Sequence, residues 1–154
     1  MTRRRLFIAV VLLLMANLLM VSGASAAGCT VSSSGVSFGS FNPLTLTYVD
    51  STGSITVNCT DISSYSISLS TGSGTYSQRH MVAGGYYLYY NFYRDAAFQQ
   101  IWGDGISGSY TVSLNNPVNG QNNLHTIYGR IPVSTQRAAS VGIYSDTITV
   151  TVSF

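Results

Sequence analysis

Few side chains in this 154-residue sequence have the type and spacing that catalysis or metal binding requires. The two histidines, His80 and His125, lie far apart and neither stands in a metal-binding spacing. No phosphate-binding glycine loop precedes a predicted helix. Asp104, between two glycines, and Asp146, before the last alternating segment, are expected to hold turns. We therefore expect no enzymatic activity, no cofactor and no metal site.

The N-terminal segment, residues 1–26, has the order of a secretory signal peptide. Three arginines precede a long apolar run, and the small residues Ala24-Ser25-Ala26 follow at the cleavage position. The apolar run is short for a helix that spans a bilayer. We expect cleavage after Ala26 or the residue that follows it. The protein would then be exported to the periplasm and on to the cell surface, with a single mature domain over residues 27–154.

Cys29 and Cys59 are the only cysteines, and both follow the predicted export signal. An oxidising compartment favours a disulfide between them, which would stabilise the fold by roughly 3–4 kcal/mol. Two distant cysteines without neighbouring histidines do not form a metal ligand set. A lipoprotein cleavage box at residues 26–29 is the alternative. It lacks the usual Leu at its first position, and lipidation of Cys29 would leave Cys59 unpaired.

The charge of the expected mature chain excludes nucleic acid as a partner. It contains four Arg, five Asp and neither Lys nor Glu, so its net charge is −1 rather than the +2 of the whole sequence. No basic stripe is present that would bind nucleic acid or anionic lipid. The many Ser, Thr, Tyr, Val and Ile residues are instead typical of β-sheet surfaces.

Alternation of apolar and polar residues is the dominant pattern, and it predicts an all-β sandwich. In the clearest case, Ile148, Val150, Val152 and Phe154 alternate with Thr and Ser. Arg79 and His80 are expected at a sheet edge. Other predicted strands include residues 55–59, 65–69, 86–93, 110–114 and 126–133, with an earlier one through Val36, Phe38 and Phe41. Turns are predicted at residues 71–74, 84–85, 102–105 and 115–117, and a helical turn at 96–101.

A series of short motifs resembles the spore coat protein U domain family over nearly the whole mature region. That family includes subunits of archaic chaperone–usher pili. The motifs are CTV (29–31), VSFGSFNP (36–43), ITVNC (55–59), YSISLS (65–70), RHM (79–81), LYY (88–90), IWGDG (101–105), IYGRIP (127–132) and GIYSDTITVTV (142–152). Each motif is weak alone, but their order together is specific.

The resemblance implies an immunoglobulin-like sandwich that lacks its last strand and is completed by a donor strand from another chain. The partners that it implies are a periplasmic chaperone, an outer-membrane usher and a neighbouring pilus subunit. The side chains expected to face the unfilled donor-strand groove are Ile148, Val150, Val152, Phe154, Val36 and Phe38. Burial of each of the four large apolar side chains at the C-terminus would contribute about 2 kcal/mol to stability, and an open groove forgoes this contribution.

One departure from the family concerns the segment before Cys29. A subunit that donates a strand needs an alternating extension there, and the expected cleavage leaves only Ala27 and Gly28. The sequence therefore predicts a strand acceptor at a chain end, such as a pilus tip. Two alternatives stay open. One is a secreted coat or matrix protein, and the other is an adhesive module that binds a surface carbohydrate through exposed tyrosines and glycine-rich loops.

Overall fold

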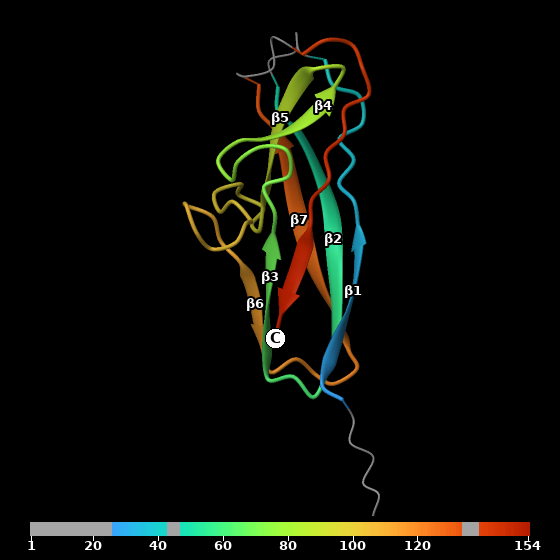
Figure 1. Ribbon diagram of the computed structural model, residues 1–154, viewed down its shortest axis with the longest axis vertical. Helices are drawn as coiled ribbons and strands as arrows, with labels where there is room; N and C mark the ends of the chain where they lie inside the picture. The colour runs from blue at the N-terminus through green and yellow to red at the C-terminus, as the bar shows by residue number, and fades with distance from the viewer. Residues whose placement is uncertain (1–25, 43–46, 134–138) are drawn as a thin grey trace, which may run out of the picture.

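The computed structural model describes residues 26–42, 47–133 and 139–154. Nearly all of the expected signal peptide, residues 1–25, lies outside the described residues. Among the described residues there is no helix that is long and apolar enough to cross a membrane. The described chain folds into strands joined by turns and irregular segments (Figure 1). The strands are β1 (Gly28–Ser34), β2 (Val49–Thr60), β3 (Ser64–Leu69), β4 (Arg79–Ala83), β5 (Tyr86–Tyr93), β6 (Val112–Asn115), β7 (Asn122–Ile131) and β8 (Val150–Ser153).

The strands form two antiparallel sheets that pack face to face as a sandwich, as the alternation predicts. One sheet has the order β1-β2-β7-β5-β4, and the other has the order β6-β3-β8. β2 and β7 form the longest pairing, from Val49 opposite Ile131 to Asn58 opposite Asn122. The two sheets are linked where Val82 of β4 pairs with Ser145, just before β8. The immunoglobulin-like, all-β fold expected from the sequence is therefore confirmed.

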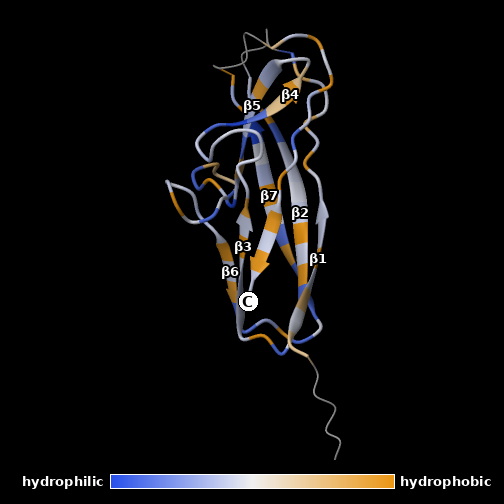
Figure 2. Ribbon diagram, in the orientation of Figure 1, coloured by the Kyte–Doolittle hydropathy of each residue, from blue (hydrophilic) through white to orange (hydrophobic). Residues whose placement is uncertain are grey.

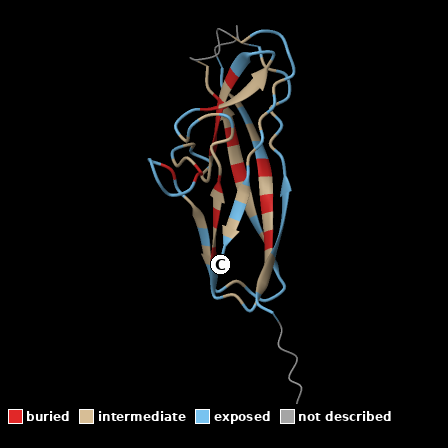
Figure 3. Cartoon of the chain, viewed as in Figure 1, coloured by how far each residue is buried: buried red, intermediate tan, exposed pale blue. Residues whose placement is uncertain are grey.

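The core lies between the sheets and is built from alternate residues of β2, β3, β5 and β7. Figure 3 shows this as buried bands that alternate with partly exposed ones along β2. Trp102 closes one side of the core, is fully buried, and donates its indole N–H to the carbonyl of Ile67 over 3.0 Å. The other buried apolar residues are Ile55, Val57, Cys59, Tyr65, Ile67, Leu69, Leu88, Tyr90, Phe92, Ile127 and Ile131.

β8 differs from the inner strands because none of its residues is fully buried. Its apolar residues Val150 and Val152 are half-buried, although their neighbours Leu69 and Ile67 on β3 are buried. The strand keeps the hydrophobic alternation of a core strand, as Figure 2 shows, but it has only one covered side. β8 therefore resembles the other two edge strands of the described residues that contain no fully buried residue, β1 and β6.

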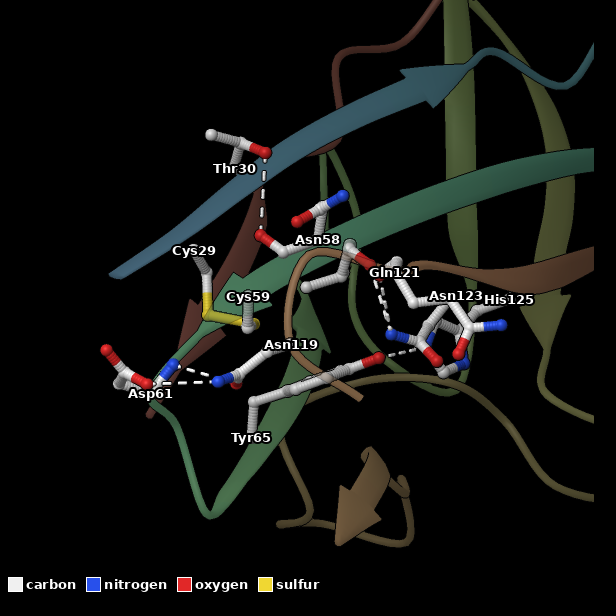
Figure 4. The surroundings of a disulfide bond; sticks show 11 residues. Cys29, Thr30, Asn58, Cys59, Asp61, Tyr65, Asn119, Gln121, Asn123 and His125 are labelled. Carbon is white, nitrogen blue, oxygen red and sulfur yellow. Dashed lines mark hydrogen bonds between the residues drawn. A yellow bond between two sulfur atoms is a disulfide. The ribbon is translucent and has the colours of Figure 1, made fainter. Parts of the chain in front are cut away.

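Cys29 and Cys59 form the predicted disulfide, which joins directly opposite residues of β1 and β2. The bond lies at the end of the sandwich where β1 begins, and Cys59 is buried (Figure 4). Asp61 and Asn119 bond to each other in the adjoining turns through side chains and backbone. The disulfide thereby anchors β1, an edge strand that pairs only with β2 among the described residues.

Several local predictions were wrong. Residues 36–41 form no strand, since β1 ends at Ser34, and residues 96–101 form turns and bends with Phe98 at a positive φ of 55°. β8 begins at Val150 instead of near residue 147. Arg79 and His80 do begin the edge strand β4, as predicted, but the Arg79 side chain is fully buried.

Candidate strand-binding groove

A groove opens between the segment that follows β1 and the segment that leads into β8. Its first compartment has a volume of about 290 Å³. The floor consists of the core residues Leu69, Tyr90, Phe92 and Ile127, which come from both sheets. The groove therefore exposes the interior of the sandwich to an incoming side chain. The walls are formed by Ser33, Ser34, Gly35, Val36, Phe38, Met81, Tyr144, Ser145, Asp146, Ile148 and Val150.

Val36 and Phe38 form one wall because two glycines leave room for them. A Cβ on Gly129 of β7 would lie 2.9 Å from atoms of both side chains, and a Cβ on Gly53 of β2 would lie 2.8 Å from Val36. Gly53 and Gly129 are both buried and have no side chain, so they leave a gap on the inner surface of the larger sheet. Val36 and Phe38 fill this gap, and the Phe38 ring lies 5.9 Å from that of Tyr90. The chain therefore leaves the β1 ladder to cross the inner surface of the sheet.

A second compartment continues the groove toward the β4–β5 end of the sandwich. It has a volume of about 560 Å³, and it is lined by residues 36–41 on one side and 139–144 on the other. Met81, Leu88 and Ile131 contribute further apolar surface. The side chains of Val141 and Ile143 at its rim are almost fully exposed. The second compartment is thus the larger of the two, and apolar side chains contribute to the lining of both.

Asp146 supplies a carboxylate to the wall of the first compartment. Its Oδ1 atom accepts hydrogen bonds from the backbone N–H groups of Ser73 and Thr147 and from the Ser73 hydroxyl. Its Oδ2 atom accepts a 2.7 Å bond from the Tyr90 hydroxyl. Burial raises the pKa of the Tyr90 phenol, and the bond to Asp146 raises it further. Asp146 therefore ties the segment before β8 to the turn at residues 71–74, whereas the sequence predicted that it holds a turn directly before the last strand.

The peptide groups of β8 alternate between the partner strand and the open side. The N–H of Ser70 donates to the Thr149 carbonyl, and the Thr149 N–H donates to the Ser70 hydroxyl. Thr149 therefore directs its peptide groups toward β3. Since alternate residues of an antiparallel strand share this direction, Val150 and Val152 direct theirs to the opposite side. In the described residues no strand covers that side, because β8 ends its sheet.

Arg79 lies beneath the groove and makes four hydrogen bonds although it is fully buried. Its Nε and Nη2 atoms donate to the Ser70 carbonyl over 3.0 and 2.8 Å. Nη2 also donates to the Trp102 carbonyl, and Nη1 donates to Asn91 Oδ1 over 2.6 Å. Burial lowers the pKa of this guanidinium because desolvation disfavours the charged form. Arg79 and Met81 lie two residues apart in β4, so they share one face of the strand. This spacing could have predicted an inward-facing Arg79, but its charge argued against burial.

The six side chains expected to face the groove lie in different places. Val36, Phe38, Ile148 and Val150 line it. Val152 packs against the core further along β8, and Phe154 is 63% exposed. Neither histidine belongs to a metal ligand set, since no cluster of His, Cys, Asp or Glu suited to a metal occurs among the described residues. His125 bonds through Nε2 to the Tyr65 hydroxyl over 2.7 Å, and His80 lies against the Tyr87 ring.

Comparison with known families agrees with this architecture. The model of the Spore Coat Protein U domain matches residues 15–151. The chain belongs to this family. The Spore Coat Protein U domain match includes both walls of the groove and β8 as far as Thr151.

A solved structure resembles this Spore Coat Protein U domain across most of its length. It is the CsuC–CsuE chaperone–tip adhesion subunit pre-assembly complex from archaic chaperone–usher Csu pili of Acinetobacter baumannii. The TM-score is 0.58 and the sequence identity is 25%. The match covers 84% of this chain and 40% of the other, so this chain spans less than half the length of the protein that it resembles. No curated protein matches the sequence.

Proposed function

We propose that this protein is a structural subunit of a surface pilus, exported through a chaperone–usher route, and that its groove accepts a β-strand from another chain. The observation that carries the proposal is the open groove. Its floor is made of core side chains, and the free edge of β8 runs beside it. An added strand would bond to the peptide groups of Val150 and Val152, and its alternate side chains would fill the two compartments.

The energetics of an open groove favour such an occupant. Ile148, Val150 and Phe38 are half-buried at its walls, and each would gain on the order of 1–2 kcal/mol from full coverage. A typical domain is stable by only about 5–15 kcal/mol, so an unfilled groove is a large fraction of the total. An exposed apolar edge also promotes aggregation. These costs support a partner that covers the groove from export onward.

The comparisons support the kind of partner. The similar structure contains a chaperone and a tip adhesion subunit of an archaic chaperone–usher pilus. By analogy, a periplasmic chaperone would cover the groove first, an outer-membrane usher would take the subunit to the surface, and a neighbouring subunit would then replace the chaperone. A position at the end of the pilus depends on cleavage after Ala26, which N-terminal sequencing of the exported protein tests.

The proposal is tested by supplying a strand in the same chain. An alternating Thr/Val donor of ten residues is fused after Phe154 through a short turn, so that it runs antiparallel to β8. We expect the fusion to be monomeric and to gain several kcal/mol in unfolding free energy over the unfused chain. A fused donor with Asp at the inward positions is the control. An equal gain from both donors, or none from the alternating donor, would contradict strand acceptance.

Matched variants of β8 show whether the gain comes from the groove. Val150→Asp places a charge in the groove wall and should abolish the stabilisation by the donor. Thr151→Asp changes the neighbouring exposed residue and should leave the stabilisation within about 0.5 kcal/mol. Equal effects of the two substitutions would place the donor elsewhere.

A further inference from the structure

The hydrogen bonds of Ser70 define where the pairing of β3 with β8 stops. Ser70 and Thr149 are opposite residues, and in a regular antiparallel pair each N–H would bond to the opposite carbonyl. Here only half of that pattern is present. The Ser70 N–H donates to the Thr149 carbonyl over 3.0 Å, but the Thr149 N–H donates to the Ser70 side-chain hydroxyl over 2.9 Å.

The Ser70 carbonyl is engaged by Arg79. Two guanidinium N–H groups, from Nε and Nη2, donate to this one oxygen. The same guanidinium is fixed by the Trp102 carbonyl and by Asn91 Oδ1, and it lies 5.5 Å from the Tyr76 ring and 5.8 Å from the Phe92 ring. Because the side chain is fully buried and held on several sides, it has little freedom to release Ser70.

The chain before Thr149 runs toward the other sheet. Ser145 pairs with Val82 of β4 through two backbone bonds of 3.0 and 3.4 Å, and Asp146 bonds to Tyr90 of β5. Residues 145–148 therefore leave β3 and form the groove wall. Because residues 145–148 turn away from β3, the floor residues between this segment and the segment that follows β1 stay uncovered.

We propose that Arg79 is a positioning residue for strand acceptance: by occupying the Ser70 carbonyl it ends the β3–β8 ladder at Thr149, and so fixes the wall of the groove and the free edge of β8 before a donor arrives. The inference rests on the proposed function only in its last step, which is the presentation of the edge to a donor.

Amide hydrogen exchange on the unfused mature chain, at low micromolar concentration, tests the structural step. Lys keeps the charge of Arg79 but cannot reproduce its fork of donors. In Arg79→Lys the freed Ser70 carbonyl can accept the Thr149 N–H, so we expect exchange at Thr149 to slow about tenfold relative to the β2–β7 core amides. Faster exchange confined to Thr149 would overturn the proposal. Arg94→Lys is the control, because Arg94 also stacks on a ring, that of Tyr110, but bonds to Gln100 and Thr111. It should leave Thr149 unchanged.

A second variant decides the question if Arg79→Lys does not fold. Ser70→Ala removes the hydroxyl that accepts the Thr149 N–H while leaving the carbonyl to Arg79. We expect exchange at Thr149 to rise about tenfold. Continued protection of Thr149 in Ser70→Ala would mean that its N–H uses the Ser70 carbonyl, which would overturn the proposal. A uniform rise over the whole core in Arg79→Lys would also overturn it, since it would indicate a general structural role.

The donor-fused chain tests the last step separately. In the fused wild type, the Val150 and Val152 amides should be protected, and Arg79→Lys should reduce that protection about tenfold. Equal protection in the two fused chains would overturn the role of Arg79 in acceptance. Absence of protection in the fused wild type would instead contradict the proposed function, while the Thr149 result on the unfused chain would still decide whether Arg79 ends the ladder.

Discussion

The hydroxyl of Tyr90 donates a 2.7 Å hydrogen bond to Oδ2 of Asp146 at the wall of the groove. The bond connects β5 in the larger sheet to the segment that precedes β8 in the smaller one. Together with the Val82–Ser145 pairing, it holds the two sheets together on the β4 side. The opening of the sandwich is therefore confined to the side between β1 and β8.

Tyr90→Phe should destabilise the protein by about 1–3 kcal/mol, because it leaves the Asp146 carboxylate without one of its partners. The raised pKa of Tyr90 also predicts a pH dependence. The folded state keeps the proton that the unfolded chain loses above pH 10.0, so stability should fall as the pH rises above that value. Chemical denaturation of wild type and variant between pH 7 and 11 tests both effects. An unchanged alkaline slope in Tyr90→Phe would show that another tyrosine accounts for it.

Gly129→Ala should narrow the groove as well as destabilise the fold. The new methyl group would lie 2.9 Å from atoms of Phe38 and Val36, so these side chains must move away from β7 and into the groove. We expect a loss of roughly 1–3 kcal/mol and a weaker stabilisation by the fused donor. Gly35→Ala is the matched control, because nothing lies within 4 Å of its added Cβ and its effect should be small. Similar losses from the two substitutions would contradict the close packing at Gly129.

His125 should make the protein sensitive to mild acid. Burial lowers its pKa below the ordinary 6.5, so the unfolded chain binds a proton more readily than the folded one. Stability is then fully present above pH 6.5 and falls as the pH decreases through the interval between the two pKa values. For one proton the slope has an upper limit of about 1.4 kcal/mol per pH unit. Urea denaturation from pH 7.5 to 5 should show this slope in the wild type. The same slope in His125→Asn would exclude His125 as its source.

Residues that alternate regularly could be placed from the sequence alone. Ile55, Val57 and Cys59 alternate with polar residues because one face of β2 meets the core, and the structure buries all three. The predicted disulfide followed from two cysteines in exported sequence, and it is present. These predictions depend only on neighbours along the chain or on simple pairing.

The groove depends on relationships that no local pattern contains. Val36 and Phe38 alternate like strand residues, but they occupy a gap created by Gly53 and Gly129, which come from two other strands. Arg79 was expected to begin an edge strand, and no local pattern indicated that its side chain is buried, because charged side chains rarely are. Its burial becomes possible through carbonyls supplied by two loops, at Ser70 and Trp102. The late start of β8 follows from the same contact, since Arg79 occupies the carbonyl that would extend the ladder toward residue 147.

The most direct test of strand acceptance is residue-resolved amide exchange in β8, with and without the fused alternating donor. The Val150 and Val152 amides face the free edge, whereas the Thr149 N–H is already bonded to Ser70. We predict that the donor slows exchange at Val150 and Val152 by at least about a hundredfold, while Thr149 changes far less. Unchanged exchange at Val150 and Val152 in a donor-fused chain, or equal slowing at all three amides, would contradict the account.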